Sequence, residues 1–184
     1  MALNFILVAG ITLIGLQHKT VPYIVQVDKH GYSVAISRAE AANWPNDRIL
    51  ISWVGQYIQN LRTVVTDTRA QRSLIDWVYA STPQGSSAHS SINAWYSANN
   101  PYKRSRDGQT VAIQIESIVP MGDSRKSWQV KWEETTYARG AKQGSAKHTG
   151  IFTMDVSPNT ELKSVITNPL GIFVTEIQTT QTYN

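Results

Sequence analysis

The chain has 184 residues, of which 41% are hydrophobic and 16% are charged, a length and composition that suit one domain with a real core and exclude intrinsic disorder. Its 17 basic and 13 acidic residues give a net charge of +4, which is too mild and too evenly spread to indicate a nucleic-acid-binding protein. Because cysteine is absent, disulfides and thiolate metal sites are excluded, and the chain can fold in a reducing or an oxidising compartment.

An uncharged apolar run, residues 2–16, opens the chain. As a helix rising about 1.5 Å per residue, it covers only about three quarters of a ~30 Å hydrocarbon core. Three interpretations compete: a secretory signal segment, a buried helix, or the second part of a membrane anchor whose beginning would precede this sequence. A signal segment would need a basic start and a small-residue cleavage site, and a buried helix would show a polar face. We favour the anchor.

The anchor interpretation divides the chain into residues 1–18, the C-terminal part of a transmembrane helix, and residues 19–184, a separate domain. The Lys and Arg residues that would set the orientation of the helix are expected to precede this sequence, so its topology does not follow from the residues given. Alternating apolar residues then predict a strand over residues 21–27, a turn at residues 28–31 and a second strand after it.

A long amphipathic helix is predicted next. Asn43 or Asn46 can cap it, and Pro45 is tolerated in a first turn. Spacings of three and four then form one apolar stripe, made of Leu50, Trp53, Val54, Tyr57, Ile58, Leu61, Val64 and Val65.

Two shorter helices are predicted after this one. The first follows Thr66-Asp67, carries Gln71, Leu74, Ile75 and Val78 at helical spacing, and is broken at residues 81–83. The second contains Ile92, Trp95 and Tyr96 and ends at residues 99–101.

Four strands follow, separated by glycine-containing turns, and they predict an antiparallel meander over residues 110–119, 127–137, 148–156 and 171–180. Between the last two, Asn159 or Thr160 could cap a short helix that Asn168-Pro169 ends. Trp128, Val130 and Trp132 share one side of their strand, as expected for a sheet with one covered face. Segregated helices and strands indicate the α+β class, as a curved antiparallel sheet with its helices packed on one face.

Motifs for phosphate-binding loops, nucleophilic serine and zinc are absent. The four histidines, His18, His30, His89 and His148, are far apart in sequence and are interpreted as solvated loop residues, so we expect no metal site and no cofactor. The glycines of residues 138–147 are interpreted as a hairpin tip. Glu133 and Glu134 face opposite sides of a strand, which favours salt bridges or solvation over a catalytic carboxylate pair.

A basic tract, Tyr102, Lys103, Arg104 and Arg106, could contact phosphate or an acidic partner, although a solvated loop is the favoured interpretation. DNA contact would require this tract to gather with Lys126, Lys142 and Lys147 on one face.

An enzyme of the same fold class, similar to a steroid isomerase, is the alternative from another functional class. It would need a general-base aspartate near a hydrogen-bonding tyrosine. Asp76, beside Trp77 and Tyr79, is the candidate base, and its helical position favours an ordinary surface residue.

Four segments carry a family resemblance: VPYIVQVDKHG, ANNPYKRSRDGQTVAIQIESIVP, SWQVKWEETTY and NPLGIFVTEI. Together they resemble the TrbF-like conjugal transfer proteins, bitopic inner-membrane subunits of bacterial type IV secretion systems, over nearly the whole chain. The most specific piece is Asn168-Pro169-Leu170-Gly171, which matches the family's N-P-x-G motif. This sequence departs from the family pattern by lacking the cytoplasmic tail and part of the anchor.

The resemblance implies one inner-membrane helix, through residues 2–16, and a periplasmic domain similar to nuclear transport factor 2. It also implies an assembly scaffold that self-associates and contacts other type IV secretion subunits, with no enzymatic activity, no cofactor and no small-molecule substrate. Within its motif, Pro169 fixes the exit from the short helix, Asn168 can hydrogen-bond the backbone, and Gly171 permits a turn. A structural role for this corner is favoured over a partner surface.

Overall fold

The computed structural model describes residues 23–27, 33–38, 45–157 and 166–182. The chain divides into two compact units, Met1–Ala41 and Ala42–Asn184. The apolar run of residues 2–16 lies outside the described residues, so the predicted anchor and its boundary at residue 18 stay predictions. Among the described residues, none of the helices has the length and apolar character needed to cross a membrane.

The first unit contains two strands, β1 (Tyr23–Val27) and β2 (Ser33–Arg38), which pair antiparallel with Val25 opposite Ile36. This pairing confirms the predicted hairpin, whose turn lies outside the described residues.

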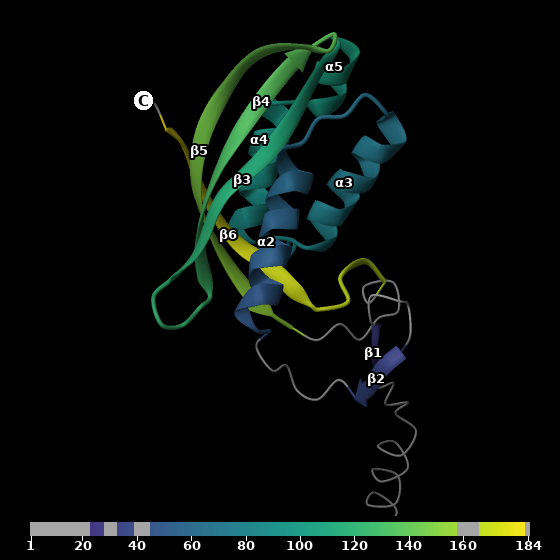
Figure 1. The fold of residues 1–184 in the computed structure, drawn as a ribbon, viewed down its shortest axis with the longest axis vertical. Coiled ribbons are helices and arrows are strands. Elements are labelled where there is room, and N and C mark those ends of the chain that lie inside the picture. Colours follow the sequence, from purple (N-terminus) through teal and green to yellow (C-terminus); the bar gives the residue numbers. More distant parts are fainter. Residues whose placement is uncertain (1–22, 28–32, 39–44, 158–165, 183–184) are drawn as a thin grey trace, which may run out of the picture. The chain divides into compact units, whose positions relative to one another are not determined.

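The second unit contains four described helices followed by a sheet (Figure 1). The helices are α2 (Asp47–Arg62), α3 (Thr68–Ala80), α4 (Ser87–Ala98) and α5 (Pro101–Arg106). The strands are β3 (Gln109–Met121), β4 (Ser127–Ala138), β5 (Ala141–Val156) and β6 (Ile172–Thr182). Each strand pairs antiparallel with the next, in the order β3-β4-β5-β6, which confirms the predicted meander and the α+β class.

Each of these helices begins at a side chain that accepts a hydrogen bond from the backbone of its first turn. Asn46 caps α2, Asp67 caps α3, Ser86 caps α4 and Asn100 caps α5. Such caps satisfy N–H groups that have no partner inside the helix, so local sequence fixes where the helices start.

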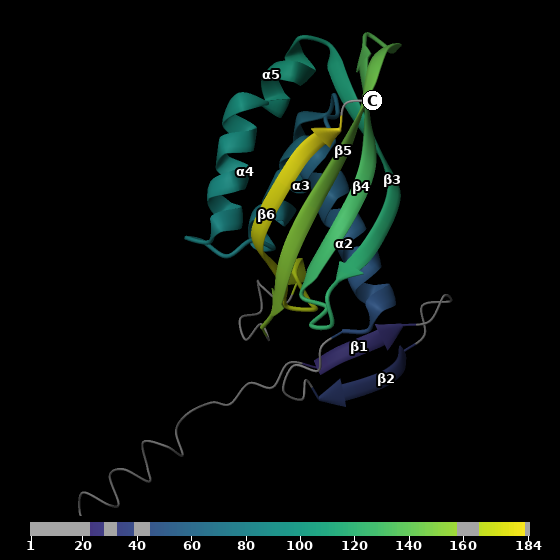
Figure 2. The ribbon, with the colours of Figure 1, turned by 90° about the vertical axis from the view of Figure 1, so that its left-hand side faces the viewer.

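The covered face of the sheet forms the core. Trp128, Val130 and Trp132 of β4 are fully buried, as the alternation predicted, and they pack with the stripe of α2 and with Phe152 of β5. Figures 1 and 2 show α2, α3 and α4 on one side of the curved sheet.

Three predictions of secondary structure are wrong: the end of the first long helix, the loop at residues 101–106 and the length of one hairpin tip. The helix α2 ends at Arg62 and does not continue to Val65, because Val64 forms two backbone hydrogen bonds with Val111 of β3. Residues 101–106, predicted as a loop, form α5, because Asn100 caps this turn and Pro101 occupies its first position.

The hairpin tip predicted over residues 138–147 is also shorter. Arg139 and Gly140 alone form the turn between β4 and β5, both with positive φ, as in two-residue hairpin loops. Gly144 lies within β5, opposite Thr136.

Candidate functional site: the α4–β6 groove

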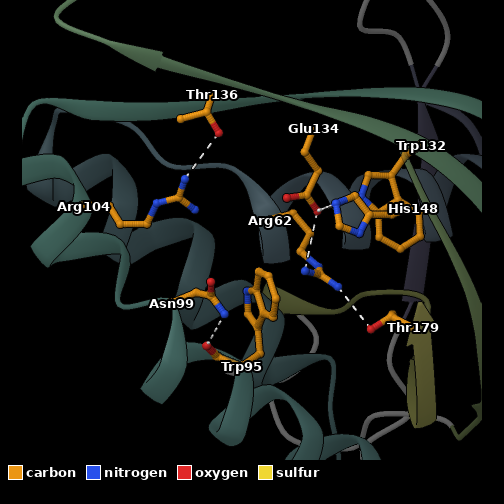
Figure 3. Close-up of polar contacts among 9 residues, drawn as sticks. All are labelled: Arg62, Trp95, Asn99, Arg104, Trp132, Glu134, Thr136, His148 and Thr179. Carbon is orange, nitrogen blue, oxygen red and sulfur yellow. Dashed lines mark hydrogen bonds and ion pairs between the residues drawn. The ribbon is translucent and has the colours of Figure 1, made fainter. Parts of the chain in front are cut away.

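Arg62, the last residue of α2, is a buried cation between the sheet and α4. Its side chain is 4% exposed. The guanidinium carbon lies 3.6 Å from the ring centroid of Trp95 and 5.4 Å from that of Trp132 (Figure 3). Two indole faces therefore flank the charge, an arrangement that favours a cation electrostatically.

Polar contacts link Arg62 to three strands. Its Nη1 lies 3.5 Å from Oε1 of Glu134 on β4, and its Nη2 donates a hydrogen bond of 3.3 Å to Oγ1 of Thr179 on β6. Glu134 also accepts a hydrogen bond of 2.9 Å from Nε1 of Trp132. His148 of β5 completes the cluster, with its Nε2 at 3.8 Å from Oε1 of Glu134. The predicted salt-bridge role of Glu134 is confirmed.

The guanidinium is only partly satisfied. Nε and Nη1 are buried and have no hydrogen-bond partner within the described part of the chain. Burial lowers the pKa of Arg62 and the Glu134 carboxylate opposes that shift, so the side chain stays charged at neutral pH. A buried cation whose N–H groups are not all hydrogen-bonded can bind one more anionic group.

A groove of about 480 Å³ lies beside this cation, between α4 and β6. Its lining is mostly apolar, with Arg62, Asn99 and Thr179 as the principal polar side chains. The lining residues are Leu61, Arg62, Ser91, Ile92, Ala94, Trp95, Ala98, Asn99, Ile177 and Thr179. Within the described residues no group of three or more His, Cys, Asp or Glu could hold a metal ion.

The interpretation of His148 as a solvated loop residue is wrong. It lies in β5, its side chain is 12% exposed, and its ring stacks on Trp132 with centroids 5.5 Å apart. His89 lies in α4, not in a loop. His18 and His30 lie outside the described residues.

Burial lowers the pKa of His148, and the nearby Arg62 charge adds to this effect while Glu134 opposes it. The unfolded chain, with an ordinary histidine pKa of about 6.5, therefore binds more protons than the folded chain just below that pH. We expect the free energy of unfolding to fall as the pH drops from about 7 to 5, by at most about 1.4 kcal/mol per pH unit from this residue.

Urea unfolding at several pH values checks this expectation. The variant His148→Gln should have a flatter pH dependence of the free energy of unfolding than the wild type. Equal slopes for His148→Gln and the wild type would show that the burial of His148 does not cause the pH dependence of stability.

The predicted corner, Asn168-Pro169-Leu170-Gly171, directly precedes β6. Ile166 and Thr167 are helical, and the predicted caps of their helix, Asn159 and Thr160, lie outside the described residues. Buried Asn168 donates a 2.7 Å hydrogen bond from Nδ2 to the carbonyl of Ile172. Pro169 is exposed and Leu170 packs against the core.

Gly171 is buried and adopts a φ of +60°. Its N–H donates to the carbonyl of Asn168, and its carbonyl accepts from the N–H of Ser157. These contacts support the structural interpretation of the corner, because they hold the start of β6 beside the end of β5. Its role as a partner surface stays a prediction.

Replacing Gly171 with valine is expected to lower the free energy of unfolding by about 2 kcal/mol, because a left-handed backbone costs an L-residue roughly 1–2 kcal/mol and a branched side chain more. A melting curve measures the structural role of Gly171, and a conjugative transfer assay measures its role in assembly. Pro169→Ala, at an exposed position, is the control. Normal transfer by a folded Gly171→Val variant would count against both roles.

The predicted basic tract lies at one end of the second unit. Lys103 and Arg106 are exposed on α5, and Tyr102 and Arg104 are half-buried. Lys103 pairs with Asp107 at 2.9 Å. Arg104 donates a hydrogen bond to Oε1 of Gln109. It also donates one to Oγ1 of Thr136 (Figure 3).

The basic tract and the three lysines of the DNA-contact hypothesis, Lys126, Lys142 and Lys147, do not gather on one face. Lys142 lies at the start of β5, next to the β4–β5 turn, whereas Lys126 lies in the β3–β4 turn, at the opposite end of the sheet (Figure 1). Lys147 pairs with Glu116 at 2.7 Å. The candidate base Asp76 is 69% exposed on α3 and lies 3.7 Å from Arg72, so it is the predicted surface residue.

Comparison with known proteins gives a consistent result. A family model described as VirB8 protein matches residues 1–182. The conjugal transfer protein TrbF of Rhizobium radiobacter is 30% identical over 165 residues, which cover 89% of this chain and 74% of that protein.

Solved structures share the fold at low sequence identity. A TrwG component of the type IV secretion system of Bartonella birtlesii has a TM-score of 0.61 and 16% identity, covering 78% of this chain and 96% of that one. VirB8 of Agrobacterium tumefaciens has a TM-score of 0.60 and 15% identity, covering 72% and 90%. TraE in complex with 2-(2-furyl)isonicotinic acid has a TM-score of 0.62 and 14% identity, covering 76% and 100%.

The family model spans almost the whole chain, and a relative at 30% identity covers most of it. The resemblance to TrbF-like proteins is therefore confirmed, and this chain belongs to the VirB8 family of type IV secretion proteins.

Proposed function

We propose that this chain is a non-enzymatic scaffold subunit of a conjugative type IV secretion system. It is anchored in the bacterial inner membrane through residues 2–16, holds its C-terminal domain in the periplasm, and acts by self-association and by contacts with other channel subunits. Family membership and the TrbF relative support the secretion role. The uncharged opening run supports the anchor.

The observation that carries the proposal is a group of exposed apolar side chains on α2 and on the edge strand β3. Ile51 is 38% exposed, Val119 is 45% exposed and Met121 is 39% exposed. We call these three residues the edge patch. Exposed large apolar side chains next to an unpaired strand edge are typical of protein-contact surfaces.

Contacts on either side of Ile51 bring α2 against the end of β3. Asp47, one turn before it, pairs with Arg125 of the β3–β4 turn at 2.9 Å. Gly55, one turn after it, faces Ile118, whose Cδ1 would lie 3.4 Å from a methyl group placed there. Residues four apart share a helix face, so Ile51 lies near this end of β3, on the helix side of the sheet. Ile118 faces α2, so Val119 and Met121 point to the other face of the sheet, and the edge patch extends around the edge of β3.

Disulfide crosslinking in membranes tests self-association, because the chain has no cysteine of its own. We expect Ile51→Cys and Met121→Cys to form covalent dimers on mild oxidation. Ser73→Cys, at an exposed position on α3, is the matched control and should stay monomeric. Dimers in equal yield at all three positions, or at none, would contradict self-association through the edge patch.

We also propose that the α4–β6 groove binds a planar carboxylate, independently of any catalysis. The specific observation is the buried Arg62, whose Nε has no hydrogen-bond partner among the described residues and whose Nη1 has only the 3.5 Å ion pair with Glu134. The solved TraE structure contains an aromatic carboxylic acid, which agrees with this ligand chemistry.

Titration calorimetry with 2-chloroisonicotinic acid tests the groove, and isonicotinamide is the uncharged control ligand. The acid should bind at least about tenfold more tightly, since a charge-assisted hydrogen bond to a buried cation contributes more than about 1.4 kcal/mol. Equal affinity for the amide, or no heat of binding from the acid at millimolar concentration, would exclude this use of the groove.

A further inference from the structure

Five cations occupy one end of the second unit, where α5 meets the β4–β5 hairpin. We call this surface the basic end, and it consists of Lys103, Arg104, Arg106, Arg139 and Lys142. Figure 1 shows α5 and this hairpin at the end of the domain opposite to the start of α2.

Backbone contacts fix the hairpin against the helix. Gly108 donates its N–H to the carbonyl of Ser105, and its own carbonyl accepts the N–H of Arg139, both at 2.9 Å. The Cγ of Arg139 packs against Gly108, 3.4 Å from where a methyl group on that glycine would lie. The cations of α5 and of the hairpin therefore belong to one preformed surface.

Most of this charge is not neutralised within the described residues. Asp107 pairs with Lys103 at 2.9 Å, but Arg106, Arg139 and Lys142 are exposed and have no ion pair in the described part of the domain. Some cations elsewhere in this unit are paired, such as Lys147 with Glu116 and Lys126 with Asp155, so the basic end is set apart by the clustering of its unpaired cations. Unpaired like charges held together repel one another, which an anionic partner would relieve.

We infer that the basic end docks a segment rich in aspartate and glutamate on another periplasmic subunit of the channel. This inference rests on the proposed scaffold role and adds a second contact surface to the edge patch. Complementary charge of this kind speeds association and fixes the register of the partners.

DNA fits this surface less well. Three free cations would neutralise only about three phosphates, whereas strongly salt-dependent DNA binding uses about 6–10 such contacts.

Photocrosslinking in donor cells tests the inference with the full chain. The probe is p-benzoylphenylalanine at Gln143, an exposed position on β5 beside Lys142. The expected product joins Gln143 to a peptide of another subunit, and that peptide is rich in aspartate and glutamate. A DNA or lipid adduct in its place, or no adduct, would overturn the inference.

Charge variants make this test specific. The triple variant Arg106→Glu, Arg139→Asn, Lys142→Glu should lower the crosslink yield at least about tenfold, since each lost pair contributes up to about 1 kcal/mol. Asparagine is chosen because Arg139 has a φ of +49°, which asparagine tolerates. The control Lys131→Glu, about 20 Å away along β4, should leave the yield within about twofold.

Failure of this inference can be distinguished from failure of the scaffold proposal. Each variant is also combined with Ile51→Cys and checked by a melting curve. Loss of the crosslink with retained Ile51→Cys dimers and an unchanged melting temperature supports docking at the basic end. An unchanged crosslink yield overturns the inference, and so does a crosslink that is lost together with the Ile51→Cys dimers or with the fold. If the dimers are absent from every variant, self-association is refuted instead.

Discussion

Arg62→Ala is expected to lower the free energy of unfolding by about 3–5 kcal/mol, which is the usual cost of removing one partner of a buried ion pair. The change leaves Glu134, whose side chain is 11% exposed, without its cation. It also removes the packing between Trp95 and the guanidinium, whose carbon lies 3.6 Å from the ring centroid. Urea unfolding followed by tryptophan fluorescence should show a lower midpoint with an unchanged slope.

Two further variants interpret this result. Arg62→Met combined with Glu134→Gln removes both charges, keeps the shape and should recover most of the loss, because a buried ion pair contributes little net stability over apolar residues. Arg72→Ala breaks the exposed pair with Asp76 and should change stability by less than about 0.5 kcal/mol. A loss below about 1 kcal/mol for Arg62→Ala would show that the cluster is not a buried ion pair.

Trp132→Ala should lower the free energy of unfolding by about 3–5 kcal/mol, the usual range for removing a buried indole. Trp132 is fully buried, stacks on His148 and donates its N–H to Glu134. The indole fits because Gly150, on the neighbouring strand, has no side chain. A methyl group at Gly150 would lie 3.1 Å from Cη2 of Trp132 and 2.8 Å from Cε2 of Phe152.

A double-mutant cycle measures this size complementarity. Gly150→Ala alone should cost about 1–3 kcal/mol through overpacking. In the background of Trp132→Phe, whose ring is smaller, the same change should cost at least about 0.5 kcal/mol less, because Phe152 can move into the space. Purely additive effects would mean that the indole and the glycine are not coupled.

The secondary structure was largely predictable because it depends on short-range patterns. The helix start after Thr66-Asp67 and the alternation of Trp128, Val130 and Trp132 are local signals, and the structure confirms them. The first helix was expected to be capped by Asn43 or Asn46, and the structure has Asn46 as the cap. The helix α5 was missed because Asn100-Pro101 was interpreted only as the end of α4, although the same two residues also start a helix. Both interpretations hold at once.

The buried cluster carried weaker signals. Arg62 continues the spacing of Val54 and Ile58 along the apolar stripe of α2, and a charge at such a position indicates a buried ion pair. Glu134 continues the buried alternation of Trp132 in the same way. His148 could not be found, because its place opposite Trp132 depends on the β4–β5 register.

Self-association was proposed from the sequence without a surface to support it. Ile51 and Met121 are 70 residues apart in the chain, by subtraction of their numbers, and neither has a distinctive sequence context. The antiparallel sheet and the packing of α2 on β3 are needed to place them near the same edge. Local sequence patterns do not predict long-range pairing of this kind.

The frequency of conjugative transfer from donor cells that carry Ile51→Asp with Met121→Asp tests the central claim most directly. If exposed surfaces perform the function, these two charges should reduce transfer by at least about hundredfold, since burying an unpaired charge in an interface costs several kcal/mol. The melting temperature should stay close to that of the wild type, because both side chains are exposed. Wild-type transfer by this variant would contradict the account.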